Sequence, residues 1–115
     1  MSKVSLIRCE DYDTERIFGA VRKSVDLLGG INSFAKTGMT VLLKPNLLSA
    51  RLPEDAVDTH PEVMRAVVRL VKEAGAKPVI GDSPGGYGKN IEEVWEKSGM
   101  KRVAKELPYI FLNRP

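Results

Sequence analysis

Apolar residues recur along the chain with two different spacings, and the alternation between the two predicts the elements of the fold. Short apolar runs, typical of strands, occupy residues 4–9, 39–43, 79–80 and 109–112. Longer stretches place apolar residues three and four positions apart, as helices do, over residues 14–28, 59–74 and 91–98, with a further helical turn at 103–107. The predicted order is β-α-β-α-β-α-β.

Strands that alternate with helices predict an α/β domain with a three-layer, mainly parallel sheet of about four strands. The run at 39–43 is nearly all apolar, which is typical of a parallel strand covered on both faces. We therefore expect one core that joins the two central strands to the helices. Its predicted members are Leu42, Leu43, Val79, Ile80, Val67, Val71 and Trp95.

Capping residues and glycines predict where the helices begin and end. Asp13 or Thr14 can cap the first helix, and the pair Gly29–Gly30 ends it. Thr59 and Glu62 match the capping-box spacing at the start of the second helix. The loop at 47–58 is long for a compact α/β unit, and such loops are often functional.

The segment 78–90 has the layout of a strand, a glycine-rich loop and a helix start. Gly85, Gly86 and Gly88 allow backbone amides to converge on an anion where a side chain would otherwise intrude. A Walker A loop is excluded because Ser83 and Asn90 stand where that motif needs a glycine and a hydroxyl residue. The dinucleotide fingerprint also fails, since its third glycine is absent. Ordinary turn formation remains the alternative for this segment.

The loops that follow parallel strands gather at one edge of a sheet, where ligands of α/β proteins bind. Residues 9–11, 44–46 and 82–86 are expected at this edge, with the start of the second helix close by. We expect a small anionic ligand there, such as a phosphate, a nucleotide or a carboxylate. The predicted ligand-binding residues are Lys44, Asn46, Asp82, Ser83, Gly85, Gly86 and Gly88.

Three side chains are candidates for catalysis, although the sequence leaves open whether the protein is an enzyme. Asp82 could act as a base or could cap the amides of the glycine-rich loop. Lys44 could neutralise an anion or could simply be solvated. His60 could transfer protons or could serve the first turn of its helix. A metal site is not expected, because His60 with Asp82 or Asp58 offers too few ligands.

Composition and charge restrict the partners. A chain of 115 residues forms a single domain, residues 1–115, and the net charge of +3 comes from interspersed basic and acidic residues. No basic stripe or aromatic platform indicates nucleic acid, and no long apolar segment indicates a membrane. The single cysteine, Cys9, excludes an internal disulfide and is expected to pack as a small apolar residue. A cytoplasmic location is therefore expected.

Five stretches of the chain, taken together and in order, resemble a known family. They are Leu27-Leu28-Gly29-Gly30, Val41-Leu42-Leu43-Lys44-Pro45-Asn46, Thr59-His60-Pro61-Glu62-Val63, Gly75-Ala76 and Gly81-Asp82-Ser83-Pro84-Gly85-Gly86. The chain is similar in these stretches to the N-terminal part of the domain of unknown function 362 proteins. The resemblance names no reaction and no cofactor.

Longer relatives in that family are described as iron–sulfur proteins because they carry a cysteine-rich, ferredoxin-like portion. That portion has no counterpart here, so the resemblance implies a shortened or truncated member and transfers no cluster. Two classes of function remain open. The chain is an anion-binding domain, or it is a non-catalytic structural module that forms a homo-oligomer, a remnant of a longer iron–sulfur-associated enzyme.

Overall fold

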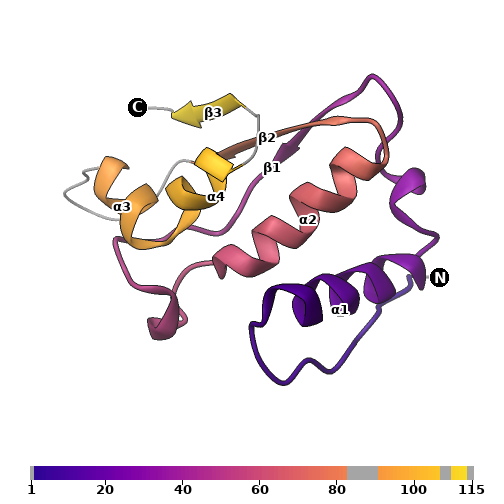
Figure 1. The fold of residues 1–115 in the computed structure, drawn as a ribbon, viewed down its shortest axis with the longest axis horizontal. Coiled ribbons are helices and arrows are strands. Elements are labelled where there is room, and N and C mark those ends of the chain that lie inside the picture. Colours follow the sequence, from indigo (N-terminus) through magenta and orange to yellow (C-terminus); the bar gives the residue numbers. More distant parts are fainter. Residues whose placement is uncertain (1, 83–90, 107–109, 114–115) are drawn as a thin grey trace.

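The computed structural model describes the backbone of residues 2–82, 91–106 and 110–113, and the side chains of residues 2–81 and 92–105. Figure 1 shows the elements in chain order. They are α1 (Thr14–Asp26), the short 3-10 turn η1 (Ile31–Ser33), β1 (Thr40–Leu43), the 3-10 turn η2 (Pro53–Asp55), α2 (Pro61–Glu73), β2 (Lys77–Asp82), α3 (Ile91–Lys97), α4 (Met100–Glu106) and β3 (Ile110–Asn113).

The strands form one parallel sheet in the order β1-β2-β3. Leu43 of β1 is opposite Ile80 of β2, and Asp82 at the end of β2 is opposite Asn113 of β3. The prediction of an α/β fold with parallel strands is confirmed. Because the strands are parallel, their carboxyl ends lie at the same edge of the sheet.

The predicted first strand at residues 4–9 is wrong. Residues 2–10 form neither helix nor strand, and the sheet of the described residues has three strands rather than about four. Val4 and Leu6 are 91% and 93% exposed, while the hydroxyl of Ser5 shares a hydrogen bond with that of Ser24 on α1. This segment therefore lies along α1, with Ser5, Ile7 and Cys9 half-buried and the residues between them exposed. A strand also needs backbone hydrogen bonds to a neighbouring strand, and among the described residues this segment pairs with no strand.

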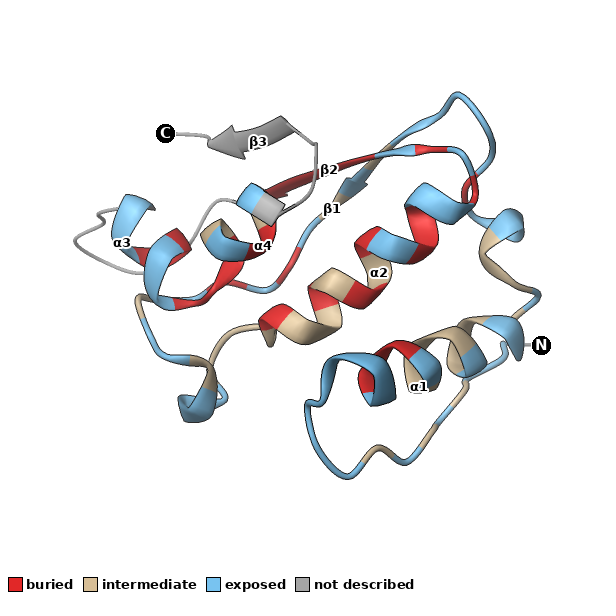
Figure 2. Cartoon of the chain, in the orientation of Figure 1, coloured by how far each residue is buried: buried red, intermediate tan, exposed pale blue. Residues whose placement is uncertain are grey.

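Helix α2 lies between the sheet and α1 (Figure 1). One side of α2 packs Met64 and Val68 with Ile80 of β2. Its other side packs Ala66 and Leu70 against the buried residues Ile17 and Phe18 of α1. The first helix thus forms an outer layer on α2 instead of covering a face of the sheet. Ile17 and Phe18 are the buried residues of α1, and the rest of the helix is exposed or half-buried (Figure 2).

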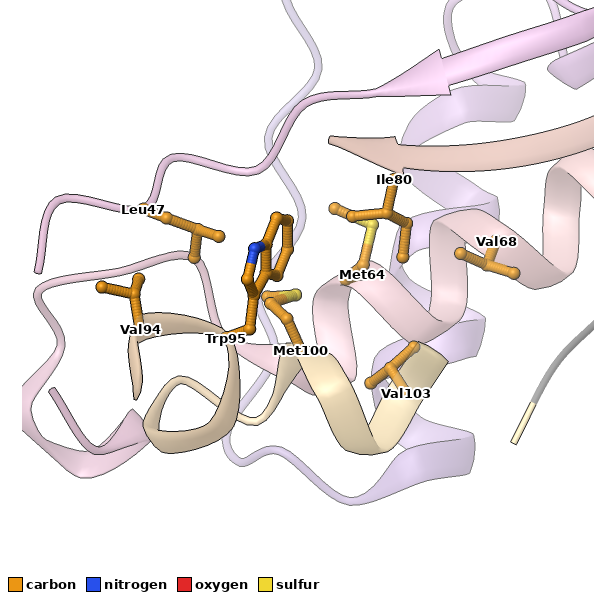
Figure 3. Packing of buried hydrophobic residues seen from close by; sticks show 8 residues of the cluster. All are labelled: Leu47, Met64, Val68, Ile80, Val94, Trp95, Met100 and Val103. Atoms are coloured by element: carbon orange, nitrogen blue, oxygen red, sulfur yellow. The ribbon is translucent and has the colours of Figure 1, made fainter. Parts of the chain in front are cut away.

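The largest cluster of buried side chains joins α2, β2, α3 and α4 (Figure 3). Trp95 is fully buried at its centre, and the other members are Leu47, Met64, Val68, Ile80, Val94, Met100 and Val103. The predicted burial of Val71, Val79, Ile80 and Trp95 is confirmed, whereas Leu43 and Val67 are only partly buried. The prediction for Leu42 is wrong, because this side chain is 56% exposed.

The first helix begins and ends where its capping residues predict. The side chain of Asp13 accepts a hydrogen bond from the backbone N–H of Arg16 at 3.1 Å. Gly29 and Gly30 then follow the helix with positive φ angles of 108° and 86°, a conformation that glycine adopts at little cost. Helix α2 does not begin as predicted, because its N-cap is His60 and not Thr59.

Candidate functional site

The carboxyl edge of the sheet brings together three positions that are far apart in the sequence. Lys44 follows β1, Asp82 ends β2 and Asn113 ends β3. The pairing of Leu43 with Ile80 and of Asp82 with Asn113 sets the three strand ends beside one another. We refer to Lys44, Asn46 and residues 82–88 as the rim. The sequence analysis missed Asn113 because the final strand was predicted to end at Leu112.

The exit from β1 alternates buried and exposed residues. Pro45 is buried and Leu47 reaches the core around Trp95, while Lys44 and Asn46 are exposed. Burying Pro45 and Leu47 fixes the course of the backbone over this stretch. Lys44 and Asn46 are therefore presented to solvent from an anchored segment rather than from a loose loop.

Asn46 is joined to the residue that precedes the N-cap of α2. The backbone N–H of Asn46 donates to Thr59 Oγ1 at 2.8 Å, and the backbone N–H of Thr59 donates to the Asn46 carbonyl at 2.9 Å. These two bonds hold the start of α2 beside the exit of β1. They also explain why the predicted capping role of Thr59 is wrong, because its hydroxyl is used to bind Asn46.

His60, and not Thr59, caps α2. Its Nδ1 accepts a hydrogen bond from the backbone N–H of Glu62 at 3.1 Å. The imidazole is stacked on Tyr12, with ring centroids 3.6 Å apart and planes 5° from parallel. Burial lowers the pKa of His60 below its ordinary value. The side chain thus already has a structural role in the first turn, as the simpler interpretation of the sequence predicted.

Asp58 holds the long loop that precedes α2. Its Oδ1 accepts hydrogen bonds from the backbone N–H groups of Leu48, at 2.7 Å, and Ser49, at 3.3 Å. Its Oδ2 is buried and has no hydrogen-bond partner among the described residues. From the sequence, Asp58 was expected only as a possible partner of His60 in a metal site, yet an aspartate in a long loop is a common acceptor for nearby amides.

Ser83, Gly85, Gly86 and Gly88 lie outside the described residues, as does the side chain of Asp82. Within the described part of the chain, no group of three or more His, Cys, Asp and Glu side chains is arranged to hold a metal ion. No helix in that part is long and apolar enough to cross a membrane.

A concave surface lies between α1 and α2. This groove of about 450 Å³ has an apolar floor that includes Phe18, and basic side chains of α2 line it. The Arg69 guanidinium lies 3.7 Å from the centre of the Phe18 ring and pairs with Glu15 at 3.1 Å. Arg65 pairs with Glu62 in the same way. Because carboxylates already accompany these arginines, the groove is a weaker anion site than its basic residues alone indicate.

Comparisons with known proteins show that the stretch of chain that includes the rim matches a recognised family. Residues 41–114 match the family model described as "Domain of unknown function (DUF362)". A thylakoid-associated protein of Synechocystis sp. is 45% identical over 84 residues, which cover 73% of this chain and 26% of that protein. The chain therefore spans about a quarter of the length of this relative. No solved structure matches the chain.

Proposed function

The chain belongs to the DUF362 family, and from that premise we propose that it binds a small anionic ligand at the rim. The ligand class is a phosphate, a nucleotide or a carboxylate. Lys44 supplies a full positive charge and Asn46 an amide, and the glycine-rich residues of the rim supply backbone N–H groups. Asp82 keeps the site from being uniformly positive, and it orients a hydroxyl group of the ligand or a cation that binds with the ligand.

One observation carries this proposal. The parallel register between β1 and β2 brings Lys44 and the beginning of the glycine-rich segment to the same edge of the sheet. Two hydrogen bonds between Asn46 and Thr59 hold the amino end of α2 beside that edge. In parallel α/β sheets, this edge is where ligands bind, because loop amides and helix starts gather there.

Titration of inorganic phosphate into isotope-labelled protein, followed by amide NMR, tests the proposal. We expect the amides of Gly85, Gly86 and Gly88 to shift. Replacing Lys44 with alanine should weaken binding by about 1–3 kcal/mol, the scale for losing a hydrogen bond to a charged group. Lys77→Ala is the matched control, because Lys77 is exposed at the opposite end of the same sheet.

The control separates a site from general attraction to a basic protein. If phosphate binds at the rim, Lys77→Ala should bind phosphate nearly as tightly as the wild type does, whereas Lys44→Ala should bind it more weakly. Equal losses in both variants, or unchanged glycine amides in the wild type, would contradict the proposal.

The second candidate is a structural module that associates with a second copy of itself. Its support is the outer edge of β1, which has no strand partner among the described residues. Leu42 on that strand is exposed, and so are Val4 and Leu6 of the extended N-terminal segment. Unpaired edges with exposed apolar side chains favour pairing between chains.

A further inference from the structure

The starts of α1 and α2 meet at two adjacent contacts. Tyr12, which precedes the N-cap of α1, stacks on His60, the N-cap of α2. Next to this stack, Thr14 Oγ1 donates a hydrogen bond to Glu62 Oε2 at 3.1 Å. Tyr12 and His60 are 48 residues apart, and only Tyr12 lies outside the part of the chain that matches the family. The stack therefore attaches the N-terminal region to the family domain.

The capping bond works only with a neutral imidazole. His60 Nδ1 accepts from the Glu62 N–H, so Nδ1 carries no hydrogen and the ring proton is on Nε2. A second proton would occupy Nδ1 and would face the Glu62 N–H, donor against donor. The added charge would also stand at the positive end of the α2 dipole. A protonated His60 must therefore turn away from the helix, which ends its parallel contact with Tyr12.

Charged groups from three elements surround this ring. Burial lowers the pKa of His60, Glu62 on α2 raises it, Arg102 on α4 lowers it, and Glu54 on η2 raises it. Tyr12 is the titratable group on the side of α1. The resulting pKa lies below the ordinary value of 6.5. The imidazole is thus neutral at neutral pH and takes up a proton only at a pH below 6.5.

We propose that the stacked pair Tyr12 and His60 is a pH-operated clasp. It holds the chain at Tyr12, just before α1, against the start of α2 when His60 is neutral, and it releases Tyr12 when His60 is protonated. The apolar contacts between α1 and α2 remain in the released state, since Ile17, Phe18, Ala66 and Leu70 do not depend on the ring. The clasp accordingly controls the entry to α1 at Tyr12 and not the whole outer helix.

The clasp also makes stability depend on pH with a defined sign. Because the folded pKa of His60 is lowered, the unfolded chain binds more protons than the folded chain between the two pKa values. The contribution of the clasp is fully present above the unfolded value and is lost as the pH falls through the folded value. Acid therefore opens the clasp.

Ring-proton NMR tests the clasp directly, because a stacked imidazole shifts the Tyr12 signals upfield. Over a titration from about pH 8 to about pH 5, we expect the Tyr12 ring signals and the amides of residues 11–13 to follow the His60 ring signals with one midpoint below 6.5. His60→Asn is the matched variant, since asparagine is a good N-cap and does not titrate in this range. It should abolish the pH dependence at residues 11–13.

A second variant keeps the test decisive if His60→Asn fails to fold. Tyr12→Ala removes the ring that covers His60, so the midpoint of the His60 signals should rise toward 6.5. The proposal is overturned if the Tyr12 signals keep their upfield position after His60 has titrated, or if the midpoint is the same with and without Tyr12. Retention of the full pH response in a folded His60→Asn protein would also overturn it.

Discussion

At the scale of single residues, Asp58 has the clearest energetic role in the loop between β1 and α2. A charged oxygen that accepts two backbone N–H groups satisfies donors that the loop would otherwise leave without a protein partner. Asp58→Ala should lower the free energy of unfolding by about 1–3 kcal/mol. Urea denaturation monitored by circular dichroism measures this change.

The matched control is Asp58→Asn, which retains an oxygen for Leu48 and Ser49 and puts an amide nitrogen in place of the buried Oδ2. This variant should lose less than half of what Asp58→Ala loses. Equal stability of wild type and Asp58→Ala would show that the two amide bonds contribute nothing.

At the scale of elements, replacing either of two glycines with alanine should change the stability of the protein, in opposite directions for the two positions. Gly19 is exposed within α1, and an added Cβ would meet no atom within 4 Å, so Gly19→Ala should stabilise the protein by about 0.5–1 kcal/mol. Gly99 joins α3 to α4 with a φ of 86°, and an added Cβ would lie 2.8 Å from Pro61 Cγ at the start of α2. Gly99→Ala should destabilise by about 1–3 kcal/mol, as overpacked sites do.

Thermal unfolding of the two variants and of the wild type checks the direction of both changes in stability. The midpoint should rise for Gly19→Ala and fall for Gly99→Ala. A fall for Gly19→Ala would mean that α1 is not a regular helix at that position, and an unchanged midpoint for Gly99→Ala would mean that the turn does not approach Pro61.

At the scale of the whole molecule, the exposed side of β1 makes self-association a testable outcome. We expect light scattering to give a mass that increases with protein concentration, because an unpaired edge strand with an exposed Leu42 favours pairing with a second copy. Leu42→Lys should shift the protein toward the monomer, since a lysine on an edge strand opposes such pairing.

Leu27→Lys serves as the control, because Leu27 is similarly exposed but lies at the end of α1. It should associate as the wild type does. A constant monomer mass for the wild type at high concentration would rule out the association, and equal effects of the two lysines would show that β1 is not the contact.

The sequence by itself determined the elements whose hydrogen bonds or turns are local. The periodicity of apolar residues and the cap at Asp13 located α1, and Gly29 and Gly30 marked its end. The apolar runs located β1 and β2, and the intervening helix made their parallel arrangement the expected one. For the same reason, the placement of Lys44 and Asp82 at one edge followed from topology.

Only the tertiary structure decided which residues found partners far away in the sequence. The apolar run at residues 4–9 suits a strand equally well as a segment that lies on a helix, and the neighbour available to it was α1. Leu42 is apolar like Leu43, but alternate residues of β1 differ in burial in the described structure. Leu43 is partly buried, whereas Leu42 is exposed. His60 became the cap of α2 because Thr59 was engaged by Asn46, and Tyr12 reached His60 only once α1 had packed on α2. Such contacts depend on long-range geometry, which a pattern of neighbouring residues does not encode.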